Sequence, residues 1–207
     1  MPYLPEGITD CSFISTSGEG ALMGELDGSA PPGAAQPVFD LDAIVHDNEQ
    51  WRATFDVGAL QVRPIKQAVI LTCMDSRYPA AAIIGFKLGE AHMIRNAGGR
   101  ATDDAIRSLI VSAHALGTRA CIVIHHTDCG LFGQTNDNLR SRVKSATGQS
   151  AAHIDFLPFA DLEESVRDDV EQIRACRFLP EGYEVVGMIY DVRTGQVIPV
   201  DTTHHKT

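Results

Sequence analysis

Two short motifs in the sequence contain the residue types that bind zinc. Cys73 begins the segment Cys-Met-Asp-Ser-Arg at residues 73–77, and His126 and Cys129 belong to His-Thr-Asp-Cys-Gly at residues 126–130. Structural zinc sites normally use four sulfur or nitrogen ligands, whereas catalytic sites use three and leave one position for water. The three residues therefore predict a zinc site with an open position, where a bound water can become a nucleophile.

A carboxylate and a guanidinium follow the first cysteine closely. Asp75 can reach either the metal or its bound water, and as a fourth ligand it would close the site. Arg77 offers two parallel N–H donors that can hold this carboxylate away from the metal. We expect Asp75 then to accept a hydrogen bond from the zinc-bound hydroxide and orient it. A strand-end salt bridge with a purely structural role is the alternative.

Other residues near the motifs have simpler interpretations. His125 would point away from His126 if the strand continues, so a core histidine is the expectation. Asp128 is expected to support its loop by accepting backbone N–H bonds. Gly98 and Gly99 lack a complete phosphate-binding motif, and we interpret them as a tight turn packed beside the site.

The two motifs meet only if strands deliver them to one edge of a sheet. Residues 68–73 and 120–124 are apolar runs that predict strands buried on both faces, as in a parallel sheet. Cys73 ends the first run, and His126 and Cys129 follow the second. In open α/β sheets, ligands bind at the carboxyl ends of the strands, where the strand order reverses. The sequence thus predicts that the motifs meet there.

The remaining pattern predicts alternating helices and strands. Thr102 is a predicted N-cap and Gly117 a predicted C-terminal residue of one helix. We expect further helices at 42–55, 79–85 and 162–176, and further strands at 92–95, 185–191 and 196–200. This alternation predicts an α/β fold with a mainly parallel β-sheet flanked by helices. Residues 1–45 are predicted to form an extended arm, and residues 46–207 a single catalytic domain.

Composition limits the classes of partner. The chain of 207 residues has a formal charge of −10, which argues against nucleic acid and anionic membranes as partners and favours a small substrate. Its apolar runs are too short to cross a bilayer, and the first 50 residues show no targeting signal. The odd number of cysteines favours reduced thiols in the cytoplasm. The cysteines are Cys11, Cys73, Cys121, Cys129 and Cys176.

The combined motif, Cys-x-Asp-x-Arg followed by His-x-x-Cys, resembles that of the β-class carbonic anhydrases. Residues 89–92, 94–99 and 103–107 extend the likeness, which is greatest to the short-chain branch that includes carbonyl sulfide hydrolases. The resemblance implies a β-carbonic-anhydrase-like fold and a Zn²⁺ ion held by Cys73, His126 and Cys129. It also implies a homodimer or a dimer-based oligomer.

We expect the zinc-bound hydroxide to attack a small linear O=C=X molecule. With carbon dioxide the product is bicarbonate; with carbonyl sulfide the products are carbon dioxide and hydrogen sulfide. Two thiolates cancel the formal charge of the ion, so activity should rise towards alkaline pH. Two alternatives belong to other classes. A non-catalytic zinc-stabilised module would use Asp75 as fourth ligand, and a Cys73 phosphatase is disfavoured because its Cys-x5-Arg motif would need arginine where Pro79 stands.

Overall fold

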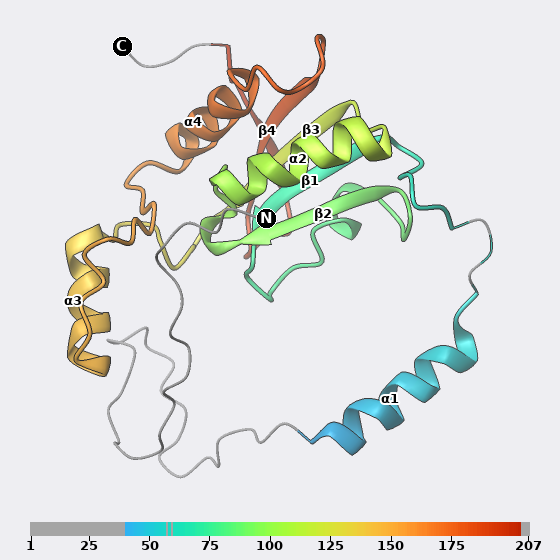
Figure 1. The fold of residues 1–207 in the computed structure, drawn as a ribbon, viewed down its shortest axis with the longest axis horizontal. Coiled ribbons are helices and arrows are strands. Elements are labelled where there is room, and N and C mark those ends of the chain that lie inside the picture. The colour runs from blue at the N-terminus through green and yellow to red at the C-terminus, as the bar shows by residue number, and fades with distance from the viewer. Residues whose placement is uncertain (1–39, 57, 59, 204–207) are drawn as a thin grey trace, which may run out of the picture.

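A five-stranded sheet forms the centre of the structure, a computed structural model that describes residues 40–56, 58 and 60–203 (Figure 1). The strand order is β2-β1-β3-β4-β5; the first four strands run parallel, and β5 is antiparallel to β4. The mainly parallel α/β fold is therefore confirmed. The strands are β1 (Ala68–Cys73), β2 (Ala91–Asn96), β3 (Ala120–His126), β4 (Glu184–Tyr190) and β5 (Val197–Val200).

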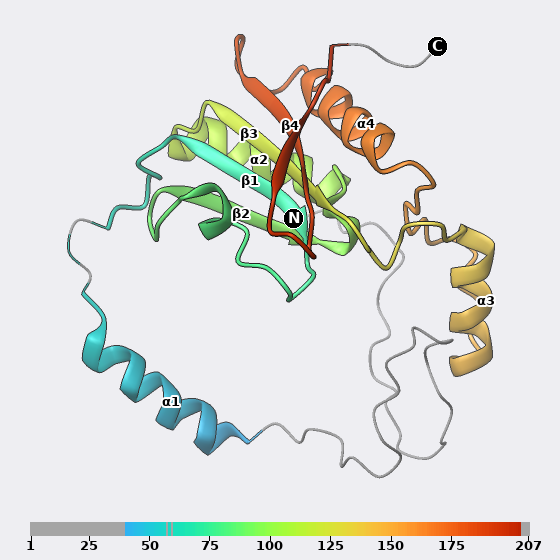
Figure 2. The ribbon, with the colours of Figure 1, turned by 180° about the vertical axis from the view of Figure 1, so that it is seen from behind.

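Two amphipathic helices, α2 (Asp103–Leu116) and α4 (Leu162–Arg174), cover one face of the sheet (Figures 1 and 2). Thr102 caps α2 by accepting the N–H of Ala105, and Asp161 caps α4 by accepting the N–H of Glu164. Their apolar sides pack on β1, β3 and β4 in one continuous core. That core includes Val69, Leu71, Leu109, Val123, Val166, Val170 and Ile173.

The opposite face of the sheet is covered by the connection between β1 and β2. Tyr78 and Ala80 pack there against Ile70, Ile124 and Tyr190. The helix predicted at residues 79–85 is only a single 3₁₀ turn, η1 (Ala82–Ile84). So short a segment offers too few backbone hydrogen bonds to offset the cost of starting an α-helix.

Helices α1 (Leu41–Thr54) and α3 (Asn136–Thr147) extend away from the sheet, as both views show (Figures 1 and 2). Neither has a buried residue. The helix predicted at 42–55 is confirmed as α1, whereas α3 was not predicted because it lacks a clear apolar stripe. Most of the predicted arm, residues 1–45, lies outside the described residues. Among the described helices, none has both the length and the apolar composition needed to cross a membrane.

Candidate metal centre

The sheet brings the two sequence motifs together at one edge. Cys73 is the last residue of β1, His126 is the last residue of β3, and Cys129 lies in the loop that follows. Because β2 lies on one side of β1 and β3 on the other, the strand order reverses between β1 and β3. The Cys73 and Cys129 sulfurs and a ring nitrogen of His126 all lie within 4.8 Å of one another. The structure thus brings these three side chains together, as the sequence predicted.

The two ring nitrogens of His126 have different surroundings, and one of them is available to bind a cation. Its Nδ1 lies 2.8 Å from the backbone oxygen of Thr127, so the ring proton is donated at that atom. The other nitrogen, Nε2, is buried and has no hydrogen-bond partner. A histidine that binds a metal commonly donates its second nitrogen to a carbonyl in this way. The buried Nε2, without a hydrogen-bond partner, therefore fits a metal ligand.

The Cys73 and Cys129 sulfurs lie side by side, and each changes the pKa of the other. The hydrogen bond from the Cys129 thiol is the largest influence on Cys73 and lowers the pKa of Cys73 to about 4. Backbone N–H groups of Asp75 and Gly98 also donate to this sulfur. Sharing its proton with Cys73 raises the pKa of Cys129, and burial raises it further. A thiolate beside a thiol and an imidazole nitrogen without a partner is a donor set suited to a soft divalent cation.

Arg77 fixes the carboxylate that lies next to the cluster. Its Nε and Nη2 bond the two oxygens of Asp75 at 3.0 and 2.8 Å, and its Nη1 lies 2.6 Å from Asp128 Oδ2. The hydrogen bond from Arg77 is the main reason that the pKa of Asp75 falls to about 2. Asp75 Oδ2 lies 3.9 Å from His126 Nε2. The carboxylate is therefore charged, held by the guanidinium and close to the ring nitrogen that faces the cluster.

Asp128 differs from the expectation. We expected its carboxylate to accept backbone N–H bonds in the loop, but it pairs with Arg77 instead. Its backbone oxygen also accepts from Arg77, at 2.8 Å, and its φ of +58° turns the chain to allow both contacts. Arg77 thereby links the segment after β1 to the segment after β3.

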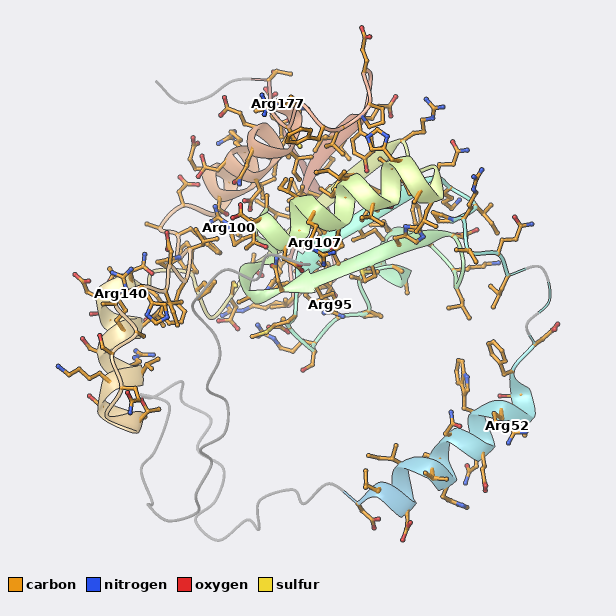
Figure 3. The ribbon with its side chains drawn as sticks, in the orientation of Figure 1. Arg52, Arg95, Arg100, Arg107, Arg140 and Arg177 are labelled. Atoms are coloured by element: carbon orange, nitrogen blue, oxygen red, sulfur yellow. The ribbon has the colours of Figure 1, made fainter. Side chains whose placement is uncertain are left out.

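Two further residues support the centre and were not singled out from the sequence. The Tyr78 hydroxyl donates to Thr72 Oγ1 at 2.7 Å, because the Thr72 hydroxyl already donates to the backbone oxygen of Ile124. The Tyr78 ring lies 5.4 Å from that of His126. Arg95, labelled on β2 in Figure 3, donates to the backbone oxygens of Cys73 and Asp75. No local pattern reveals these roles, since each depends on a neighbouring strand.

His125 faces the other side of the sheet, as predicted for a core histidine. Its Nδ1 lies 2.8 Å from Ser165 Oγ, and its Nε2 lies 3.0 Å from Asp169 Oδ2. Arg100, beside the start of α2 (Figure 3), completes this buried group by pairing with Asp169 at 3.0 Å. Sequence reasoning missed Arg100 and Asp169, because neither belongs to a motif.

The turn η2 (Ala97–Gly99) packs against the end of β1, as the two glycines had suggested. Gly99 has a φ of +73°, and a Cβ at this position would lie 2.8 Å from the backbone nitrogen of Cys73. Only glycine permits both this conformation and this approach. The turn is therefore fitted closely to the strand end that carries the first sulfur.

Comparisons with known proteins match the part of the chain that contains this site. A family model described as carbonic anhydrase matches residues 68–197. Beta-carbonic anhydrase 1 of Mycobacterium tuberculosis is 39% identical over 158 residues, which cover 75% of this chain and 94% of that protein. A carbon disulfide hydrolase of Acidithiobacillus thiooxidans is 29% identical over 179 residues, which cover 77% of this chain and 88% of that protein.

A solved structure gives the same result. The crystal structure of a carbonic anhydrase from Streptococcus mutans superposes with a TM-score of 0.76 at 41% identity, covering 80% of this chain and all of that one. Fold, motif positions and sequence similarity agree over the same part of the chain. The protein belongs to the β-carbonic anhydrase family.

Proposed function

We propose that the protein uses a zinc ion to hydrate carbon dioxide to bicarbonate. The observation that carries the proposal is the cluster of two sulfurs and the orphaned His126 Nε2, with a charged carboxylate beside it. Cys73, His126 and Cys129 would hold the ion. When bound, zinc would supply the Lewis acidity that makes water a nucleophile near neutral pH.

Asp75 and Arg77 would control how that water is presented. With its pKa lowered to about 2, Asp75 remains a charged acceptor at every pH at which the enzyme is expected to work. Its Oδ2, on the side of His126, can accept a proton of the attacking water and so direct an oxygen lone pair at the substrate. Arg77, bonded to both oxygens, would keep the carboxylate in this role rather than as a further metal ligand.

The surroundings of the sulfurs suit a small neutral substrate. Cys73 and Cys129 pack with Phe159, and Leu131 and Leu162 lie against this group. Apolar side chains next to a polar reaction centre favour an uncharged molecule such as carbon dioxide.

Carbonyl sulfide is the second candidate substrate. The relatives that are named carbon disulfide hydrolases favour it, because their names indicate hydrolysis of a linear molecule with sulfur in place of oxygen. The same nucleophile would attack the same central carbon, and the products would be carbon dioxide and hydrogen sulfide. The residues at the centre are compatible with either substrate.

A paired assay tests the proposal. One preparation, with its zinc content measured, is assayed for carbon dioxide hydration and for sulfide release from carbonyl sulfide, with and without a chelator. We expect chelator-sensitive hydration of carbon dioxide to dominate. Faster sulfide release would favour the second candidate. Stoichiometric zinc without turnover of either gas would instead support a zinc-stabilised module with no catalytic role.

We also propose that the chain works as a homodimer or a dimer-based oligomer. Helix α1 exposes a set of apolar side chains that the described part of the same chain leaves uncovered, and closed two-fold dimers are the commonest assembly. These side chains are Leu41, Ile44, Val45 and Trp51, and Phe55 follows them at the C-cap. Light scattering after size-exclusion chromatography measures the mass, and a monomer at micromolar concentration would contradict the proposal.

A further inference from the structure

We propose that Asp169 is a positioning residue for the metal centre: from α4 it fixes the segment that follows η2 and the strand end that carries His126. The inference rests on the proposed zinc function. Asp169 touches none of the three candidate ligands, so its effect must pass through the residues that it holds.

The Asp169 carboxylate is buried and contacts three separate parts of the fold. Its Oδ1 accepts the backbone N–H of Ala101 at 3.0 Å, and its Oδ2 lies 3.0 Å from Arg100 Nε and 3.0 Å from His125 Nε2. Only 1% of the side chain is exposed. One carboxylate thus connects α4 to the segment before α2 and to β3.

The first connection leads to the Cys73 sulfur. Ala101 lies two residues beyond η2, whose Gly99 packs directly on the backbone of Cys73. The preceding residue, Gly98, donates its backbone N–H to the Cys73 sulfur. A shift of the segment at Ala101 would therefore move an N–H group that stabilises the thiolate.

The second connection leads to the histidine ligand. Successive residues of a strand point to opposite faces, so His125 and His126 share one stretch of backbone but face different layers. His125 Nδ1 is hydrogen-bonded to Ser165 Oγ, and its Nε2 lies 3.0 Å from Asp169 Oδ2, an ion-pair distance without hydrogen-bond geometry. Fixing the His125 ring fixes the backbone from which the next ring, His126, approaches the cluster.

A third connection leads from the buried group to the two cysteine sulfurs through Phe159. The guanidinium of Arg100 lies 5.7 Å from the Phe159 ring centre, and the His125 ring stacks on it at 5.8 Å. Phe159 in turn packs with Cys73 and Cys129. The buried group is therefore linked to the two sulfurs through Phe159.

A contribution to stability alone does not explain this group. Removing two charges from water costs about as much as their attraction returns, and apolar replacements of such pairs are often neutral or stabilising. Three connections that together reach all three candidate ligands indicate a geometric role instead.

The decisive variant is Asp169→Asn in the full chain. Zinc affinity is measured by competition with a chromophoric chelator, and the sulfur-to-cobalt charge-transfer band is recorded after Co²⁺ substitution. We expect zinc to bind about 10-fold more weakly, in the range found for residues that support metal ligands, and the cobalt band to shift. Unchanged affinity and an unchanged band in a less stable protein would overturn the proposal.

Ser112→Ala is the matched control. Ser112 is also buried and bonds His92 and Thr118, away from the sulfurs, so its loss should lower stability without changing zinc affinity or the cobalt spectrum. If both variants weakened zinc binding equally, the effect would be one of general stability and the proposal would fail.

A second variant decides the matter if Asp169→Asn does not fold. Ser165→Ala removes the partner of His125 Nδ1 and leaves the Arg100–Asp169 pair intact. We expect a roughly threefold loss of zinc affinity with a smaller shift of the cobalt band, below the range for direct support of a ligand. Wild-type affinity and spectrum would then overturn the proposal.

The wild-type protein separates this inference from the proposed function. If it bound no zinc, the proposed function would fail and the inference with it. If it bound zinc stoichiometrically and hydrated carbon dioxide while the variants matched it in affinity and spectrum, only the role of Asp169 would be wrong.

Discussion

Two groups of arginine and carboxylate flank the same cluster and differ chiefly in exposure. In the first, the Arg77 side chain is 44% exposed and bonds Asp75 and Asp128; in the second, the Arg100 side chain is 10% exposed and bonds Asp169. An exposed pair typically contributes about 0–1 kcal/mol to stability, whereas breaking a buried pair costs about 3–5 kcal/mol. We therefore expect the Arg77 group to act in catalysis and the Arg100 group to hold the backbone around the cluster in place.

The largest effect should come from the centre that both groups flank. We expect Cys73→Ser to lower zinc affinity and activity by more than about 100-fold, since loss of a ligand exceeds loss of a supporting contact. Zinc content after dialysis and the rate of carbon dioxide hydration measure this. The control is Cys176→Ser, a partly exposed thiol outside the cluster, which should leave both unchanged. Full zinc retention in Cys73→Ser would mean that Cys73 is not a ligand.

The buried arginine should matter most for stability. We expect Arg100→Ala to lower the free energy of unfolding by about 3–5 kcal/mol, because Asp169 is left buried without its main cation. Urea unfolding of wild type and variant gives the difference. A loss below about 1 kcal/mol would remove the contrast between the two groups.

The exposed arginine should matter for catalysis instead. We expect Arg77→Ala to retain zinc and to change stability by at most about 1 kcal/mol, but to lose roughly 100-fold in kcat/KM. The reason is that Asp75 Oδ2 already lies 3.9 Å from His126 Nε2, so that a carboxylate released from Arg77 can compete for the cluster. Steady-state kinetics beside zinc analysis tests this. Unchanged turnover would reduce the Asp75–Arg77 pair to a structural salt bridge.

The smallest expected effect is the pH dependence of the stability that the Asp75–Arg77 pair contributes. Because Arg77 lowers the pKa of Asp75 to about 2, the pair stabilises the fold above about pH 4 and loses this contribution as the pH falls towards 2. We expect Asp75→Asn to lower the Tm of the metal-free protein by about 2 °C at pH 6, and by less at pH 3. Thermal melts at both values measure the change. A difference that grew on acidification would have the wrong sign.

The sequence predicted the central elements well because their signals are local. The apolar run at 68–73 coincides with strand β1. The run at 120–124 predicts β3 except for its last two residues, His125 and His126. Thr102 and Gly117 bound α2 as predicted, since capping depends on neighbouring residues. Such features follow from hydrogen bonds and side-chain spacing within a few residues.

The residues that the sequence could not reveal act across the fold. Asp169 is one acid among several on α4, and only the packing of that helix on β3 brings it to His125. Tyr78 lies five residues from Cys73, yet its role depends on Thr72 and on β3. Motifs identify the residues that contact the reacting atoms, whereas residues that hold them in place become visible only when the strands and helices are assembled.

The close fit of Gly99 against Cys73 has a consequence for redesign of the enzyme. Any larger residue there would push on the backbone that carries the first sulfur. By contrast, Met74, inside the first motif, and Phe132, two residues after the second, are 67% and 49% exposed. A library meant to change substrate preference should therefore vary these two positions and keep Gly99 invariant, so that new specificity is sought without disturbing the scaffold beneath it.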